Sequence, residues 1–253
     1  VMATWKINAA YVPLDPAYPP ERLQHIIGDA AIEQVIAQGP PSAELAKLVG
    51  GTGTQSAVRW LDLQDVKLQA QLDAMSPTAP ALGHDPQQLA QVIYTSGSSG
   101  LPKGVMIEQG ALVNLLRDHA KRMQITADSR MLNAMSLSFD AGNMCALLPL
   151  THGARLVWGD PDEHMLDVIE RSACTHMICA TALLANLPVR ELSTLQAVGF
   201  GGEACPAGLI ERWAGGGRLI NMYGPTEATV TALCKHLSPE GQVTIGTPID
   251  GMQ

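Results

Sequence analysis

The chain has 253 residues, and a hydrophobic content of 46% is enough to bury a sizeable core in one large domain or in two intimate subdomains. Its formal net charge of -8 argues against nucleic acids and anionic membrane surfaces as partners, because both call for basic patches. No apolar run approaches the roughly 20 residues that cross a bilayer, and residues 1–16 do not have the pattern of a secretory signal.

The first part of the chain has the pattern of short elements separated by proline- and glycine-rich turns. Residues 1–7 are typical of the end of a helix, with Asn8 as a plausible C-cap. The elements expected next are a strand at 10–13, an amphipathic helix at 21–31, a strand at 34–37, and surface loops around one short helix and one short strand at 40–85.

The segment YTSGSSGLPKG at 94–104 has the composition of a loop that holds phosphate groups. Glycines let consecutive backbone N–H groups converge on an anion, hydroxyls add donors, and Lys103 supplies a positive charge. Apolar runs at 89–93 and 105–107 predict buried strands on either side, which argues against a flexible linker. A Walker A loop is excluded, because Pro102 precedes the lysine and Gly104 follows it. The candidate phosphate-binding residues are Thr95, Ser96, Gly97, Ser98, Ser99, Gly100 and Lys103.

From residue 110 onwards, helical and strand patterns alternate at short intervals. Such alternation is typical of α/β units around mainly parallel sheets, with a ligand crevice at the strand ends. We expect helices at 110–123, from 139–140 to near 153, and at 163–172, 182–187 and 207–214, with strands at 130–134, 154–158, 176–179, 195–200 and 218–222. Glycines and acids follow two of these strands, at 199–203 and 223–227, so both segments should lie on one edge of a sheet together with the phosphate loop.

The cysteines are odd in number and scattered, without a C-x-x-C pair. Buried thiols in a reducing cytoplasm fit this pattern better than a disulfide framework or a zinc site, so we expect a cytoplasmic protein. The cysteines are Cys145, Cys174, Cys179, Cys205 and Cys234.

Three segments together resemble the adenylate-forming superfamily, which includes acyl-CoA ligases, luciferases and the adenylation domains of nonribosomal peptide synthetases. The segment at 94–104 is similar to the signature loop of that family, and NMYGPTEAT at 221–229 resembles its adenine-binding motif in the peptide-synthetase form. AYVPLDPAYPPERL at 10–23 is similar to a segment found chiefly in peptide-synthetase adenylation domains. The resemblance covers essentially the whole chain.

The resemblance implies that ATP and Mg²⁺ bind at these motifs. Tyr223 would stack on adenine, Asn221 would contact its exocyclic amine, and Glu227 would hold the Mg²⁺ that bridges ATP and the substrate carboxylate. Lys103, Thr95 and Glu227 would be the catalytic groups. The other nucleotide-binding residues that the resemblance implies are Gly202, Glu203, Met222, Gly224, Pro225 and Thr226. Without it, YGPTE would indicate only a turn and a helix start, with Thr226 as N-cap.

Asp140 precedes an apolar helix, and on the sequence alone a helix-capping role is favoured for it. In the peptide-synthetase branch that the chain resembles, the aspartate of this Phe-Asp motif pairs with the α-ammonium of the substrate, since a desolvated cation needs a fixed counter-charge. The implied side-chain pocket suggests an uncharged, hydrophobic amino acid, with two glycines making room for a bulky or branched chain. Its wall would be Ala141, Met144, Ile178, Gly199, Gly201, Met222, Val230 and Thr231. Ile178 is the least secure of these, because the expected proline is replaced around Cys179, Ala180 and Thr181.

The fold class expected is α/β: mainly parallel sheets flanked by helices, as in the large N-terminal subdomain of the adenylate-forming fold, incomplete at both ends. Residues 1–253 would be a partial adenylation domain that lacks the lysine-bearing C-terminal subdomain, so the chain alone should not complete the reaction. The intact enzyme would pass an aminoacyl group from its adenylate to the phosphopantetheine thiol of a peptidyl carrier protein, beside neighbouring synthetase domains.

Two alternatives remain open. One is an acyl- or aryl-CoA ligase of the same superfamily, against which YVPLDP and Asp140 argue. The other is a catalytically silent nucleotide-binding fragment.

Overall fold

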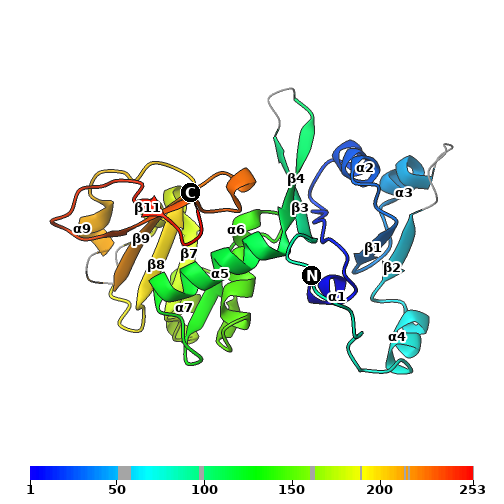
Figure 1. Ribbon diagram of the computed structural model, residues 1–253, viewed down its shortest axis with the longest axis horizontal. Coiled ribbons are helices and arrows are strands. Elements are labelled where there is room, and N and C mark those ends of the chain that lie inside the picture. Colours follow the sequence, from blue (N-terminus) through cyan, green and yellow to red (C-terminus); the bar gives the residue numbers. More distant parts are fainter. Residues whose placement is uncertain are drawn as a thin grey trace. The chain divides into compact units, whose positions relative to one another are not determined.

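The computed structural model describes residues 1–50, 58–96, 100–159, 163–188, 190–213, 215 and 217–252, with the backbone alone for 48–50. The chain divides into two compact units, Val1–Met106 and Ile107–Gln253. Each unit combines helices with strands (Figure 1), and within the described ranges no helix is long and apolar enough to cross a bilayer.

In the first unit, helices pack beside a small parallel sheet. Strand β1 (Gln34–Ala37) pairs in parallel with β2 (Arg59–Asp62). Helix α2 (Pro20–Asp29) buries an apolar stripe, Leu23, Ile26 and Ile27, at the spacing of one helix face, and packs against α3 (Ala43–Gly50). The other helices in the described part of this unit are α1 (Met2–Lys6) and α4 (Val66–Asp73). The loop region at 40–85 thus contains one helix more than the sequence predicts.

Strands β3 (Leu89–Ser96) and β4 (Pro102–Glu108) form a two-stranded sheet of their own. The strand predicted at 10–13 is reduced to a single parallel bridge between Tyr11 and Gln91. Tyr11 N–H donates to the carbonyl of Ala90 at 2.9 Å. The ladder does not continue because Pro13, two residues on, has no N–H to donate.

The second unit contains a sheet with seven strands in the described part of the chain, in the order β11-β10-β9-β8-β7-β5-β6. The strands β5 to β9 are parallel, and the last two are antiparallel to their neighbours. The strands are β5 (Arg130–Asn133), β6 (Arg155–Trp158), β7 (His176–Ala180), β8 (Ala197–Gly201), β9 (Arg218–Tyr223), β10 (Leu233–Leu237) and β11 (Thr247–Pro248). The predicted α/β fold with mainly parallel strands is therefore confirmed, whereas β10 and β11 were not predicted.

Helices cover both faces of this sheet. On one face, Met177, Val198 and Phe200 are buried in a core that includes residues of α7, α8 and α9. On the other face, α6 packs on β7, with the Cys145 Sγ 3.9 Å from the carbonyl oxygen of Ile178. The helices of the second unit are α5 (Gln109–Met123), α6 (Asp140–Leu150), α7 (Met165–Arg171), α8 (Thr181–Asn186), α9 (Leu209–Trp213) and the short 3-10 helix η1 (Thr226–Ala228).

Candidate functional site

The glycine-rich ends of β8 and β9 lie side by side at one edge of the large sheet, as predicted. Gly201 is the register partner of Met222 on β9, and Ala180 of β7 is its partner on the other side. Because carboxyl ends of parallel strands meet at the same edge, the segments 199–203 and 223–227 emerge together. The phosphate loop does not end a strand of this sheet, since it joins β3 and β4, which form a separate two-stranded sheet in the described part of the chain. That part of the prediction was wrong, because periodicity identifies strands but not the sheet to which they belong.

Met222 fills the space next to both glycines of the predicted side-chain wall. A Cβ at residue 199 would lie 2.5 Å from Met222 Cε and 2.9 Å from Ile178 Cγ1. A Cβ at residue 201 would meet the backbone carbonyl oxygen of Met222. Gly201 therefore allows β8 and β9 to pair closely, and the room at Gly199 is taken by side chains. This differs from the expectation that both glycines leave open room for a bulky substrate.

Asp140 is the first residue of α6, and its side chain is half-buried. The N-cap is Phe139, which makes no side-chain capping bond, so Asp140 is not the N-cap residue. Its Oδ1 nevertheless accepts a hydrogen bond of 2.7 Å from the N–H of Ala141. Since a carboxylate has two oxygens, it can also accept from a substrate ammonium. Met144 lies one turn further along the helix and is 1% exposed.

The turn before α6 is held tightly. A Cβ at Gly142 would collide with the carbonyl oxygen of Ser136, so the turn approaches the first turn of the helix as closely as a glycine allows. Asn133, at the end of β5, donates from Nδ2 to the Gly142 carbonyl at 3.2 Å and accepts from the Met135 N–H at 2.9 Å. These contacts fix the start of α6 and therefore the position of Asp140.

Asn221 and Tyr223 fit the role predicted for them as adenine-binding residues. Asn221 is 6% exposed, and its Nδ2 donates to the Thr244 carbonyl at 3.0 Å. With the nitrogen engaged, the amide oxygen is the atom that can accept from an exocyclic amine. Tyr223 is 52% exposed at the end of β9, where its ring can stack on a base. Side chains alternate along a strand, so Met222 between them points to the opposite face.

The segment after Tyr223 contains backbone strain. Thr229 and Val230 have φ values of 57° and 68°, in a region that β-branched residues rarely adopt, at a cost of about 1–3 kcal/mol each. The turn is closed by a hydrogen bond of 2.8 Å from Ala232 N–H to the Tyr223 carbonyl, and a Cβ at Gly224 would lie 2.6 Å from Ala232 N. Such strain is common at ligand sites, and it directs Val230 and the buried Thr231, both predicted wall residues, into fixed positions.

The predicted magnesium ligand, Glu227, is an exposed carboxylate in the middle of η1. Mg²⁺ usually takes one or two protein carboxylates and completes its shell with substrate phosphates and water, so this residue fits the ion. Among the residues that the structure describes, no three His, Cys, Asp or Glu side chains gather in a metal-binding cluster. The N-cap of η1 is Pro225, so Thr226 does not cap the turn as the alternative interpretation expected.

Thr181 is a residue of this edge that no motif pointed to. It is 1% exposed at the start of α8, and its Oγ1 donates to the carbonyls of Gly201 at 3.0 Å and Glu203 at 3.3 Å. It thereby fixes the turn at 201–203, where Gly202 has a φ of +90°. The signal in the sequence was indirect, since Thr181 lies where the pattern of the resembled family departs.

The phosphate loop lies between two strands, as predicted, but β4 is not the buried strand expected at 105–107, since Met106 is 70% exposed. Thr95 is half-buried and Ser96 exposed at the end of β3, Gly100 has a φ of +87°, and Lys103 is exposed on β4. The candidate residues Gly97, Ser98 and Ser99 lie outside the described residues.

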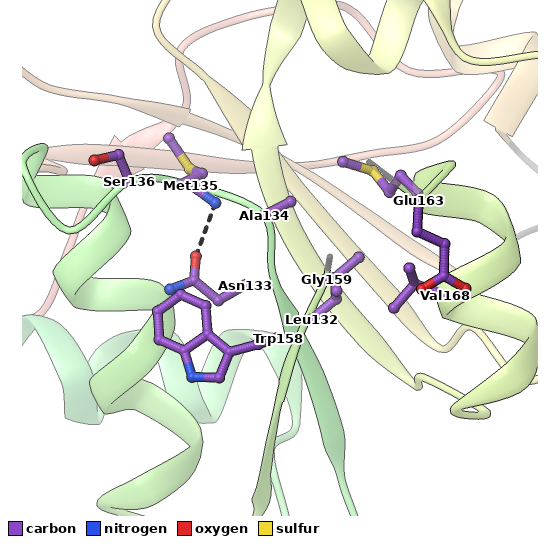
Figure 2. Close-up of a pocket in the computed structure, with 10 residues that line it drawn as sticks. Leu132, Asn133, Ala134, Met135, Ser136, Trp158, Gly159, Glu163 and Val168 are labelled. Carbon is purple, nitrogen blue, oxygen red and sulfur yellow. Dashed lines mark hydrogen bonds between the residues drawn. The ribbon is translucent and has the colours of Figure 1, made fainter. Parts of the chain in front are cut away.

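A cavity of about 370 Å³ opens at the carboxyl ends of β5 and β6 (Figure 2). Its lining includes Asn133 and Trp158, which are register partners, and Glu163, which forms an ion pair of 2.7 Å with Arg171. None of the residues predicted from the sequence lines this cavity. Asn133 and Glu163 are engaged with the protein, and the predicted wall residues lie elsewhere, so this cavity is not the predicted pocket.

The whole chain, residues 1–253, matches the family model of AMP-binding enzymes. The chain belongs to the AMP-binding enzyme family. It is 37% identical over 254 residues to a linear gramicidin synthase of Brevibacillus parabrevis, covering 98% of this chain and 3% of that protein. It is 36% identical over 271 residues to "Novobiocin biosynthesis protein H" of Streptomyces niveus, covering 100% of this chain and 42% of that protein. The chain thus spans less than half the length of these AMP-binding relatives.

Solved structures show the same fold. The complex of VinN with L-aspartate matches with a TM-score of 0.81 and 24% identity, over 98% of this chain and 65% of that one. The nonribosomal peptide synthetase FmoA3 matches with a TM-score of 0.78 and 24% identity, over 97% of this chain and 27% of that one. The family match confirms the family resemblance seen in the sequence. The solved structures confirm the predicted α/β fold class.

Proposed function

We propose that this chain forms part of a domain that activates an amino acid as its aminoacyl adenylate, with ATP as the second substrate. The observation that carries the proposal is the start of α6, where a single half-buried carboxylate, Asp140, opens a helix whose residues 142–149 are all buried. The same helix packs on β7 at Ile178, next to Gly199 and Met222. One fixed negative charge beside an apolar wall fits a substrate with an α-ammonium group and an uncharged side chain.

The reaction requires positioning and charge stabilisation, without a protein nucleophile. An oxygen of the substrate carboxylate attacks the α-phosphorus of ATP, the bond from that phosphorus to the bridging oxygen breaks, and pyrophosphate leaves. Lys103 and Thr95 would hold the outer phosphates, Asn221 and Tyr223 would hold the base, and Glu227 would bind Mg²⁺. The ion, when bound, neutralises charge on the phosphates and substrate carboxylate.

The apolar wall supports a hydrophobic amino acid as the substrate. Met144, Ile178 and Met222 are buried, and Met222 occupies the space beside Gly199. The names of several relatives, among them the gramicidin synthase and a bacitracin synthase, are those of peptide synthetases. They support transfer of the activated amino acid to the phosphopantetheine thiol of a carrier protein.

The test is amino-acid-dependent exchange of labelled pyrophosphate into ATP by the full-length enzyme, run across the proteinogenic amino acids. Exchange with one or a few hydrophobic amino acids is expected. If no amino acid supports exchange, while a carboxylic acid and coenzyme A yield a thioester, the enzyme is a CoA ligase and the proposal is wrong. Exchange with lysine or glutamate alone would keep amino-acid activation but contradict the assignment of the wall.

A further inference from the structure

Helix α2 contacts both strands that flank the phosphate loop. The hydroxyl of Tyr94 on β3 donates to Oδ2 of Asp29 at 2.6 Å. Nε2 of His25 lies 3.0 Å from the carbonyl oxygen of Pro102 on β4. A carbonyl can only accept, so this ring nitrogen carries the proton and donates.

The spacing of these contacts is matched on both sides. His25 and Asp29 are four residues apart, and therefore lie on one face of α2. Their partners Tyr94 and Pro102 directly precede Thr95 and Lys103, the two residues proposed to hold the phosphates. One turn of the helix thus contacts the residue directly before Thr95 on β3 and the residue directly before Lys103 on β4.

Side-chain packing holds the contact between α2 and the two strands in place. The rings of His25 and Tyr94 meet edge to face, with centroids 6.3 Å apart and an interplanar angle of 83°. Tyr94 is 8% exposed, and its Cζ would lie 3.1 Å from a Cβ at Gly104, so its ring covers the glycine that follows Lys103. Burial, assisted by the hydrogen bond to Asp29, raises the pKa of Tyr94 well above its usual range, so the hydroxyl stays a donor.

The helix itself is fixed on its other face, where Leu23, Ile26 and Ile27 are buried. Asp29 is the last residue of α2, where the helix dipole disfavours a negative charge. Its carboxylate therefore does not stabilise the helix. The contact with Tyr94 gives it a role.

We propose that His25 and Asp29 are positioning residues that hold the two ends of the phosphate loop, so that Thr95 and Lys103 meet the outer phosphates of ATP. This inference rests on the proposed function, in which those phosphates are the ligand. It extends the nucleotide site to His25 and Asp29 of α2, which lie outside all three recognised motifs.

The test uses the full-length enzyme and measures the Kd for MgATP by titration calorimetry, together with the KM for each substrate in pyrophosphate exchange. Tyr94→Phe keeps the ring over Gly104 but removes the hydroxyl, and Asp29→Ala removes its acceptor. Each should weaken ATP binding about tenfold, the effect of losing one hydrogen bond to a charged group, and leave the KM for the amino acid unchanged. Asp29→Asn, which keeps an acceptor oxygen, should restore most of the affinity, and Glu21→Ala on the exposed side of α2 should have no effect.

Measuring Tyr94→Phe in a Lys103→Ala background separates a positioning effect from a general loss of folding. Because the contacts of α2 act on ATP only by positioning the loop residues, Tyr94→Phe should weaken ATP binding much less when the Lys103 side chain is already absent. An equal loss in both backgrounds, or a parallel rise in the KM for the amino acid, would overturn the inference. If the wild-type enzyme shows no amino-acid-dependent exchange, the proposed function fails, while the ATP titrations still decide the role of α2.

Discussion

The side chain of Met222 lies across Gly199, with its Cε 2.5 Å from the position that a Cβ of residue 199 would occupy. Ile178 Cγ1 is 2.9 Å from the same position, so the ends of two flexible side chains fill the space that this glycine leaves. At Gly201, by contrast, a Cβ would meet the backbone carbonyl of Met222. One glycine leaves a space that side chains fill, and the other lets two strands approach each other.

Gly201→Ala should therefore destabilise the enzyme more than Gly199→Ala. The methyl group at 201 meets a carbonyl that cannot move without disturbing the β8–β9 pairing, at a cost of about 1–3 kcal/mol or more. At 199 the methyl group only displaces the end of Met222. Thermal unfolding of the two variants compares them. Equal shifts of the melting temperature would show that Met222 is held as rigidly as the backbone.

Met222→Ala should move the substrate preference toward larger side chains, because it empties the space beside Gly199. It should also lower the stability by about 2–5 kcal/mol, as other truncations of buried methionine do. Met177→Ala is the matched control, since Met177 is buried on the opposite face of the sheet. Pyrophosphate exchange with small and large hydrophobic amino acids measures the preference. A control that shifts it equally would contradict a direct role for Met222.

Lys103→Ala should weaken the use of ATP by the loss of one to three charge-assisted contacts, roughly 1.5–3 kcal/mol each. The KM for ATP in pyrophosphate exchange reports this change. Lys67→Ala removes the same charge from an exposed position of the same unit and should leave the KM unaltered. Unchanged kinetics in the Lys103 variant would rule out its contact with the phosphates.

Asp140→Ala should leave the substrate ammonium without its counter-charge, a loss on the order of 3–5 kcal/mol for a desolvated pair. The loss should be much smaller for the analogue that lacks the amine, so activation of both compounds is compared. Asp140→Asn can still accept from Ala141 N–H but has no charge. If this variant keeps its activity, or if both substrates lose equally, Asp140 only stabilises the start of α6.

Acid should destabilise the second unit through His119. Burial lowers the pKa of this residue to about 4, and the Asp118 carboxylate, 3.6 Å from Nδ1 and bonded to Arg122, opposes the shift only in part. An unfolded histidine titrates near 6.5, so the unfolded state binds more protons below that pH. The contribution of His119 to the free energy of unfolding is therefore fully present above about pH 6.5. It is lost as the pH falls to about 4, which lowers that free energy by about 3 kcal/mol.

The measurement for His119 is the denaturant midpoint of unfolding between pH 4.5 and pH 7.5. His119→Leu should flatten this dependence, because an apolar side chain has no proton to gain. The buried His176, whose pKa is also lowered by burial, remains in both proteins and supplies the residual slope. A slope that does not change in the variant would show that His119 is protonated at no cost.

Much of the organisation of this protein follows from local pattern. Strand β1 begins and ends where predicted, and the apolar helix α6 starts at the predicted Asp140, because periodicity and a change of polarity mark these elements along the chain. The phosphate loop could also be predicted, since glycines, hydroxyls and a lysine between two apolar strands are a local property. Strand β10 escaped prediction because its five residues include Lys235 and His236, which weaken the apolar alternation.

Only the tertiary structure decided which strands share a sheet and which side chains meet. The motif at 94–104 does not show that β3 and β4 pair apart from the large sheet, because strand pairing depends on contacts distant in sequence. The glycine at 199 suggested open space, but Met222, 23 residues further along, reaches back to fill it. His25 and Asp29 likewise carry no signal of their own. They acquire a role only when the fold brings one turn of α2 against Tyr94 and Pro102.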